Sequence, residues 1–225
     1  GDVISITGTL TASDYLELNS ARDVVVKGDI VASDGNIDKV VIIAKGTLAS
    51  ASKVDQVVNG VYQTATTTGT GFINIQALGI DSNNFDIRAL RDININLQDN
   101  FTISGFIGGV TGFDKAQNIT IQLVDKSLDN PATAVSENTP GVTYDVINHQ
   151  LTVTGGIVAA QQNLVLQAGS IASDNSSVFI ATDLDALAKN AILLNTLVAT
   201  IDAISTVTGN ITVNEADDLI INTIS

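Results

Sequence analysis

The chain has a single histidine, His149, whose imidazole could act as a general acid or base. A catalytic histidine needs an orienting acid and a nucleophile close by, and Asp145 is the only acid near it in the sequence. The 225 residues contain no cysteine, which excludes a thiol nucleophile, a thiolate metal site and a disulfide. Nucleophile elbows, phosphate-binding loops, zinc-protease motifs and dinucleotide fingerprints are also missing from the sequence. We therefore interpret His149 as a surface or turn residue and predict that the chain is not an enzyme.

Carboxylate and amide oxygens concentrate in two short stretches, residues 34–38 and residues 81–86. Such hard oxygen ligands are the kind that calcium prefers, but neither stretch has the spacing of an EF-hand loop. Paired carboxylates could also perform acid–base chemistry on sugars if two of them converged beside a sugar-binding groove. We interpret both stretches as solvated turns and leave calcium binding there open. No catalytic, cofactor-binding or metal-binding residue is assigned from the sequence.

Two of the three arginines occupy equivalent places in the sequence. Arg22 directly precedes Asp23, and Arg91 directly precedes Asp92. Because the repetition points to structure, we expect each arginine to pair with its aspartate at a corner of the fold. Such a surface ion pair contributes about 0–1 kcal/mol.

The charge balance argues against two classes of partner. Asp and Glu number 24 against 10 Lys and Arg, for a formal net charge of −14. Nucleic acids and anionic membrane surfaces are bound largely through Lys and Arg, so neither is predicted as a partner. No run of 18 apolar residues is present, so we predict no membrane insertion. Hydrophobic residues make up 44% and aromatic residues only 4%, which predicts a core of β-branched and other aliphatic side chains.

A short strand pattern recurs along the chain. A polar Asp, Asn or Gln is followed by apolar residues that flank one variable residue, as in residues 23–26 and 92–95. Further copies begin at Asp2, Asn100, Asn118, Gln150, Asn163 and Asn210. This alternation with a period of two predicts short strands that each bury one face.

Glycines punctuate these strands at a regular interval. Gly8 and Gly28 are 20 residues apart, and Gly28 and Gly46 are 18 residues apart. A strand, a glycine corner, a second strand and a polar turn, repeated at this interval, make one coil of a β-solenoid. A β-sandwich is the competing interpretation, but sandwich strands need not resemble one another as these do.

Two phrases carry a family resemblance: Leu16 to Gly28 (LELNSARDVVVKG) and Asn163 to Gly169 (NLVLQAG). They resemble the haemagglutinin repeats of filamentous-haemagglutinin-type exoproteins, which bacteria secrete by the two-partner pathway. The resemblance is closest over residues 1–50 and 150–180. It implies an all-β fold, a right-handed parallel β-helix, and an outer-membrane transporter as a partner during secretion. Neither proline of the chain matches the secretion-domain motifs of that family, so the segment resembles repeat shaft.

Three stretches depart from the repeat. Residues 53–71 and 126–142 are rich in turn-type residues and predict loop excursions. The third stretch predicts a helix over residues 183–204, near the C-terminal end, with a strand as the alternative. Its apolar residues follow a 3-4-3-4-3 spacing: Leu184, Leu187, Ala191, Leu194, Val198 and Ile201.

Together these features predict one β-solenoid segment over residues 1–225. Because methionine is absent from the chain, we expect the segment to belong to a longer protein. The expected function is a structural and adhesive shaft of a secreted or cell-surface bacterial exoprotein, which spaces or presents binding modules. Its expected partners are a protein or glycan of a host or neighbouring-cell surface, or copies of itself. The alternatives are a subunit of a surface lattice or appendage and a β-helix carbohydrate-active enzyme.

Overall fold

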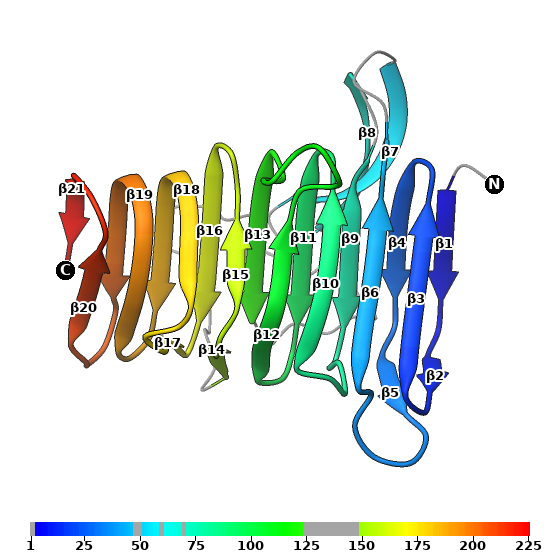
Figure 1. Cartoon of the computed structure of the whole chain (residues 1–225), viewed down its shortest axis with the longest axis horizontal. Helices are drawn as coiled ribbons and strands as arrows, with labels where there is room; N and C mark the ends of the chain where they lie inside the picture. The colour runs from blue at the N-terminus through cyan, green and yellow to red at the C-terminus, as the bar shows by residue number, and fades with distance from the viewer. Residues whose placement is uncertain (1–2, 47–50, 59–60, 69–70, 124–148) are drawn as a thin grey trace.

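The computed structural model of the chain describes residues 3–46, 51–58, 61–68, 71–123 and 149–225. Throughout these residues the regular elements are β-strands, stacked in parallel as a β-solenoid of about nine turns (Figure 1). The strands β1 (Val3–Thr7) and β21 (Ile220–Ile224) lie at opposite ends of the stack. The predicted all-β solenoid class is confirmed.

The parallel pairings arrange the strands in three columns, which we call the first, second and third faces. The first face contains β1, β4 (Asp23–Lys27), β9 (Ile73–Ala77), β11 (Asp92–Leu97), β13 (Asn118–Leu123), β16 (Asn163–Ala168), the ends of β18 (Val178–Ala188) and β19 (Ile192–Ser205), and β21. The second contains β2 (Leu10–Ala12), β5 (Ile30–Ala32), the start of β12 (Phe101–Gly108), β14 (Gln150–Val153), β17 (Ser170–Ser173), the start of β19 and β20 (Ile211–Glu215). The third contains β3 (Tyr15–Ser20), β6 (Lys39–Ala44), β10 (Asn84–Ala89), the end of β12, β15 (Ile157–Ala159), the start of β18 and the middle of β19.

The core consists of aliphatic ladders inside the stack. On the first face, Ile75, Ile95, Ile121 and Leu166 lie in register on four successive coils, and each is buried. Burying one such side chain contributes about 1.5–3 kcal/mol, so the ladders supply the main driving force for stacking. Phe85 and Phe101 add an edge-to-face contact with ring centroids 5.1 Å apart.

Polar ladders run along the same coils at the strand positions that alternate with the aliphatic ladders. Asn94 Nδ2 donates a hydrogen bond to Oδ1 of Asn74, 20 residues earlier, at 2.8 Å. Gln122 Nε2 donates to Gln167 Oε1 at 2.9 Å, and both side chains are buried. These bonds satisfy polar groups that burial would otherwise penalise, and they add to the register of neighbouring coils.

A hairpin stands where a loop was predicted over residues 53–71. The strands β7 (Ala51–Val58) and β8 (Val61–Thr68) pair antiparallel and project from the coils between β6 and β9 (Figure 1). The segment is rich in Val and Thr, which favour strands, and Asn59-Gly60 is the sequence signal for a two-residue hairpin turn. The second predicted loop, residues 126–142, lies outside the described residues.

The predicted helix over residues 183–204 is wrong. This segment belongs to β18 and β19, which pair in parallel along most of their length. Each strand alternates buried and exposed residues with a period of two, but the alternation shifts by one residue where the strand crosses a corner. The shift places the buried Ala181 and Leu184, and likewise Val198 and Ile201, three residues apart. Of the six residues with helical spacing, Leu187 and Ala191 are not buried, so the spacing does not mark one buried face.

A half-buried aspartate, Asp174, anchors the turn between β17 and β18. Asp174 Oδ1 accepts hydrogen bonds from Ser177 Oγ at 2.5 Å and from the backbone N–H of Gly155 at 3.2 Å. The Ser177 hydroxyl, with the Gly155 and Ser176 donors, lowers the pKa of Asp174 to about 2. These bonds favour the ionised form in the folded chain and tie two adjacent coils together.

We predict that this turn contributes to acid sensitivity. A lowered carboxyl pKa stabilises the fold above the unfolded value of about 3.9, and the contribution disappears as the pH falls through about 2. The free energy of unfolding of the wild-type chain should therefore fall more steeply between about pH 4 and pH 2 than that of Asp174→Asn. Urea midpoints measured at pH 5, 3 and 2 check this, and parallel curves for the two proteins would contradict it.

Candidate binding site on the third face

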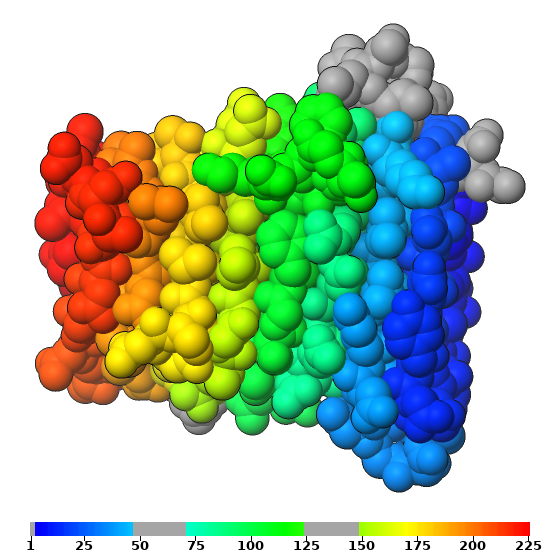
Figure 2. All heavy atoms as spheres, viewed as in Figure 1, coloured from blue at the N-terminus to red at the C-terminus, as the bar shows by residue number. Residues whose placement is uncertain are grey.

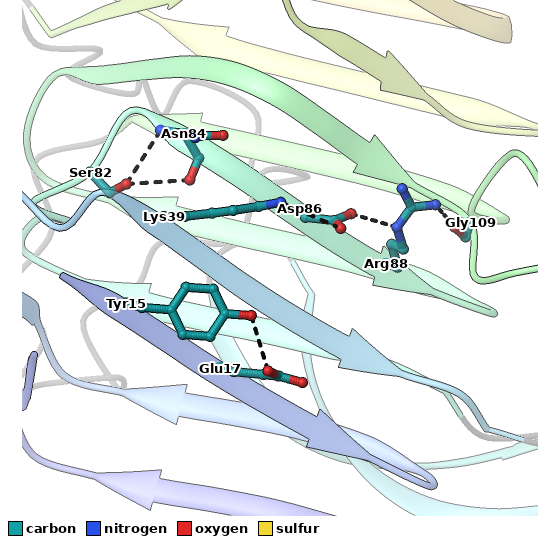
Figure 3. A network of polar contacts seen from close by, with 8 residues as sticks. All are labelled: Tyr15, Glu17, Lys39, Ser82, Asn84, Asp86, Arg88 and Gly109. Atoms are coloured by element: carbon teal, nitrogen blue, oxygen red, sulfur yellow. Dashed lines mark hydrogen bonds and ion pairs between the residues drawn. The ribbon is translucent and has the colours of Figure 1, made fainter.

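A line of polar side chains crosses the outer surface of the third face (Figure 3). Asp86 on β10 lies between two cations: its Oδ1 accepts from Arg88 Nε at 2.5 Å, and its Oδ2 is 4.0 Å from Lys39 Nζ on β6. On β3, Tyr15 Oη donates to Glu17 Oε2 at 3.0 Å. All these residues are on strands, so the sheet fixes where their side chains leave the backbone.

Arg88 is held in place from three sides. Besides Asp86, its Nη1 donates to the carbonyl oxygen of Gly109 at 3.4 Å. Its guanidinium carbon lies 4.3 Å from the centroid of the Phe106 ring, which is a cation–π contact. Phe106 is in β12, the next strand of the same face, directly beside Asp86 in register. The guanidinium is therefore oriented before any ligand arrives.

Residues 109–116 leave the coil after β12 and arch over the third face before β13. The backbone N–H of Phe113 donates to the carbonyl of Val110 at 2.8 Å, and that of Ala116 donates to the carbonyl of Ala159 at 3.1 Å. A Cβ added at Gly109, the first residue of the arch, would lie 1.9 Å from the carbonyl oxygen of Phe113. The arch therefore folds back closely on its own first residue, and only glycine fits at this position.

A pocket of about 480 Å³ opens between this arch and the strands of the third face. In Figure 2 the arch, in green, stands out from the front of the stack beside the yellow-green coils. Its apolar wall includes Phe106, Phe113 and Ile157, and the Phe113 and Ile157 side chains are 49% and 39% exposed. Its polar groups include Arg88 and Lys115. An apolar wall with two cations beside it suits binding of a ligand that has one flat apolar side and one anionic group.

A second pocket, on the second face, is lined by carboxylates from three coils: Asp29, Asp81 and Asp99. Each carboxylate accepts a hydrogen bond from a backbone N–H. The donors are Leu78 to Asp29 at 2.6 Å, Ala32 to Asp81 at 3.1 Å, and Asn100 to Asp99 at 2.7 Å. The three aspartates thus cap backbone groups at the corners of neighbouring coils.

The structure places the residues singled out from sequence as follows. His149 is half-buried before β14 and accepts a hydrogen bond through its backbone carbonyl from Gly169 N. Asp145 lies outside the described residues. Residues 34–38 form an exposed turn around the buried Ile37, whereas residues 81–86 run from a turn into β10. Within the described part of the chain, no three His, Cys, Asp or Glu side chains are grouped so that they could hold a metal ion.

The two repeated Arg–Asp pairs, Arg22 with Asp23 and Arg91 with Asp92, differ in their surroundings. Arg22 Nη2 lies 3.6 Å from Asp23 Oδ2, as predicted. Asp23 is buried, and its Oδ1 also accepts hydrogen bonds from the backbone N–H groups of Gly71 and Phe72. At the other corner, burial raises the pKa of Asp92, although the Asn118 hydrogen bond and the Arg91 charge act in the opposite direction.

The sequence analysis missed the Arg88 pocket. One signal could have indicated it: three of the six phenylalanines of the chain, Phe101, Phe106 and Phe113, fall within 13 residues. The glycines Gly108, Gly109 and Gly112 lie in the same stretch. In a chain with so few aromatic residues, that concentration marks a local departure from the repeat.

No protein-family model matches the chain, and no match was found among the curated proteins or among the solved structures. The resemblance to haemagglutinin repeats therefore stays a prediction. In the described part of the chain, no helix has the length and apolar character needed to cross a membrane.

Proposed function

We propose that this chain is a structural and adhesive shaft of a secreted or cell-surface bacterial exoprotein. The observation that carries the proposal is the unbroken stack of about nine turns, whose aliphatic ladders continue in register across excursions of the chain. Each coil adds about 4.8 Å of length, so such a stack acts as a spacer. Its interior is packed with side chains, and side chains of the third face such as Tyr15 and Ile157 are exposed and can carry contacts.

The adhesive part of the proposal rests on the third face. The pocket beneath the 109–116 arch combines exposed apolar groups with Arg88 and Lys115, on a chain whose net charge is −14. The proposed partner is a glycan or protein on a host or neighbouring-cell surface. The proposed location is the bacterial outer surface or the extracellular space, reached through an outer-membrane transporter.

Adhesion can be measured with beads that carry the purified chain. We expect such beads to be retained under flow by at least one cell type in a panel of epithelial and bacterial cells. Beads that carry the same chain after thermal unfolding are the matched control. Retention no greater than that of the control beads on every cell type would overturn the adhesive function.

A subunit of a surface lattice or appendage is the second candidate. Leu197 and Val207 favour it, because these apolar side chains are 37% and 61% exposed. Exposed apolar side chains can contact another copy of the chain. Sedimentation velocity over a concentration series distinguishes the candidates: chains that associate should show a sedimentation coefficient that rises with concentration, and a shaft segment should not.

A carbohydrate-active enzyme is the remaining alternative, and the Asp29, Asp81 and Asp99 pocket is where it would act. We propose instead that the three aspartates are structural, because each accepts a backbone hydrogen bond at a coil corner. A screen of polysaccharides, with and without calcium, should therefore give no product. Product formation that is lost in Asp81→Asn and Asp99→Asn would favour the enzyme.

A further inference from the structure

We infer that the pocket between the third face and the 109–116 arch binds a sugar residue that carries a carboxylate, such as a uronic acid within a surface glycan. This inference rests on the proposed adhesive function and names its ligand class. Four side chains carry it: Arg88, Phe106, Phe113 and Lys115. The following features of the pocket support it.

The pocket has the size and the rigidity of a small-molecule site. Its volume of about 480 Å³ lies within the usual range for such sites, which runs from about 300 to 1,000 Å³. The arch that forms its roof packs so tightly on Gly109 that a single methyl group there would meet the carbonyl oxygen of Phe113. A site that is formed before the ligand arrives loses little conformational entropy on binding.

The apolar wall suits the flat face of a sugar ring. Phe113 is 49% exposed and Ile157 is 39% exposed, and both line the pocket. One face of a pyranose ring presents mainly C–H groups, and these pack against an aromatic or aliphatic surface. In a chain with nine aromatic residues, two phenylalanines at one small pocket are a considerable share.

The charges of the pocket favour an anionic sugar. The lining residues carry two cations, Arg88 and Lys115, against one carboxylate, Asp114. Arg88 has five N–H donors, and the bonds to Asp86 and Gly109 use Nε and Nη1, which leaves further donors for a ligand carboxylate. Asp114 and Thr111 can accept hydrogen bonds from sugar hydroxyls. Asp86 pairs with Arg88 beside the pocket, so Lys115 and the remaining donors of Arg88 are the groups left for a ligand carboxylate.

The strands beneath the pocket argue for a glycan over an extended peptide. β10 is paired with β6 on one side and β12 on the other, and β15 is paired with β12 and β18. No strand edge is therefore available under the arch for a peptide to extend the sheet. A ligand here must be recognised through its own rings and polar groups.

Isothermal titration calorimetry with two oligosaccharides tests the inference. One alternates glucuronic acid with N-acetylglucosamine, and the other is its carboxyl-reduced counterpart. We expect saturable binding of the acidic probe to the wild-type chain. Phe113→Ala should weaken that binding by about tenfold, whereas Leu193→Ala, which removes an exposed apolar side chain on the second face and outside the pocket, should not change it. Equal binding by Phe113→Ala and the wild type would overturn the inference.

A charge variant tests the preference for a carboxylate. Lys115→Gln should weaken binding of the acidic probe by about fivefold and should change binding of the reduced probe by less than about twofold. Lys45→Gln, at an exposed lysine away from the pocket, is the matched control and should bind both probes like the wild type. Equal affinity of the wild type for the two probes, or no saturable binding of the acidic probe, would contradict the inference.

The same variants separate this inference from the proposed function. If beads carrying the chain adhere to cells and Phe113→Ala beads adhere equally well, the pocket inference fails and the adhesive function stands. If the pocket binds the acidic probe but the beads adhere to no cell, the adhesive function fails and the pocket stands. Each substituted side chain is exposed, so the variants should keep the wild-type unfolding midpoint.

Discussion

Substituting Ile95 with aspartate is expected to cost more than about 4 kcal/mol of stability, which is enough to unfold most of the chain. Ile95 is 1% exposed, and its register partners on the two adjacent coils, Ile75 and Ile121, are buried aliphatic residues. A carboxylate at this position would have neither water nor a charged partner, so it would bury an unpaired charge. Urea unfolding followed by circular dichroism measures the loss.

Two further variants make this prediction decisive. Asn36→Ala, in the exposed turn between β5 and β6, should change stability by no more than about 0.5 kcal/mol. Ile95→Ala should cost about 2–5 kcal/mol, which keeps the test quantitative if the aspartate variant does not fold. Similar urea midpoints for Ile95→Ala and Asn36→Ala would contradict the assignment of Ile95 to the inner ladder.

Gly105→Ala is the second substitution with a large expected effect. Gly105 lies in β12 with φ of +101°, and a Cβ there would lie 2.3 Å from the carbonyl oxygen of Phe85 on the neighbouring coil. The backbone conformation alone costs a residue with a side chain about 1–2 kcal/mol. The clash with a fixed backbone atom adds about 1–3 kcal/mol, because neither coil can move without disturbing the ladders.

A matched glycine separates these two costs. Gly112 also has a positive φ, +90°, but a Cβ there would meet nothing within 4 Å. Gly112→Ala should therefore lose only the backbone contribution, about 1–2 kcal/mol. The difference between the two variants in urea unfolding measures how tightly β10 and β12 are stacked. No difference between them would mean that these coils are not in the contact described.

The solenoid could be predicted because its signal is local and repeated. The alternation of polar and apolar residues in Asp92 to Ile95 predicts a strand with one buried face. Because the same alternation recurs along the chain, it also predicts that many strands take equivalent positions in successive coils. The Arg22 and Asp23 contact followed from the same repetition. The helix prediction failed because its spacing combined residues from both sides of two strands: Leu184 is buried, whereas Leu187 and Ala191 are not.

The binding pocket could not be predicted from the same signal. The pocket is lined by Arg88 and Ile157, which belong to different coils, and by Phe113, which belongs to the arch. Whether these side chains line one pocket depends on how many residues separate the coils. An excursion breaks the repeat, and the pattern that places the strands gives no information about where an inserted arch will pack. The contacts that fix the arch, such as the hydrogen bonds from Ala116 N to the Ala159 carbonyl and from Arg88 Nη1 to the Gly109 carbonyl, join residues far apart in the sequence.

The claim that the chain is a stacked spacer is tested most directly by one distance. Ser5 and Thr223 lie in the same column of the first face, on the first and last coils, and the chain has no native cysteine to interfere with labelling. Eight strand spacings separate them, or about 40 Å. Spin labels on Ser5→Cys/Thr223→Cys should give one narrow distance distribution centred near that value in pulsed electron paramagnetic resonance. A broad distribution, or a centre far from about 40 Å, would contradict the stacked shaft.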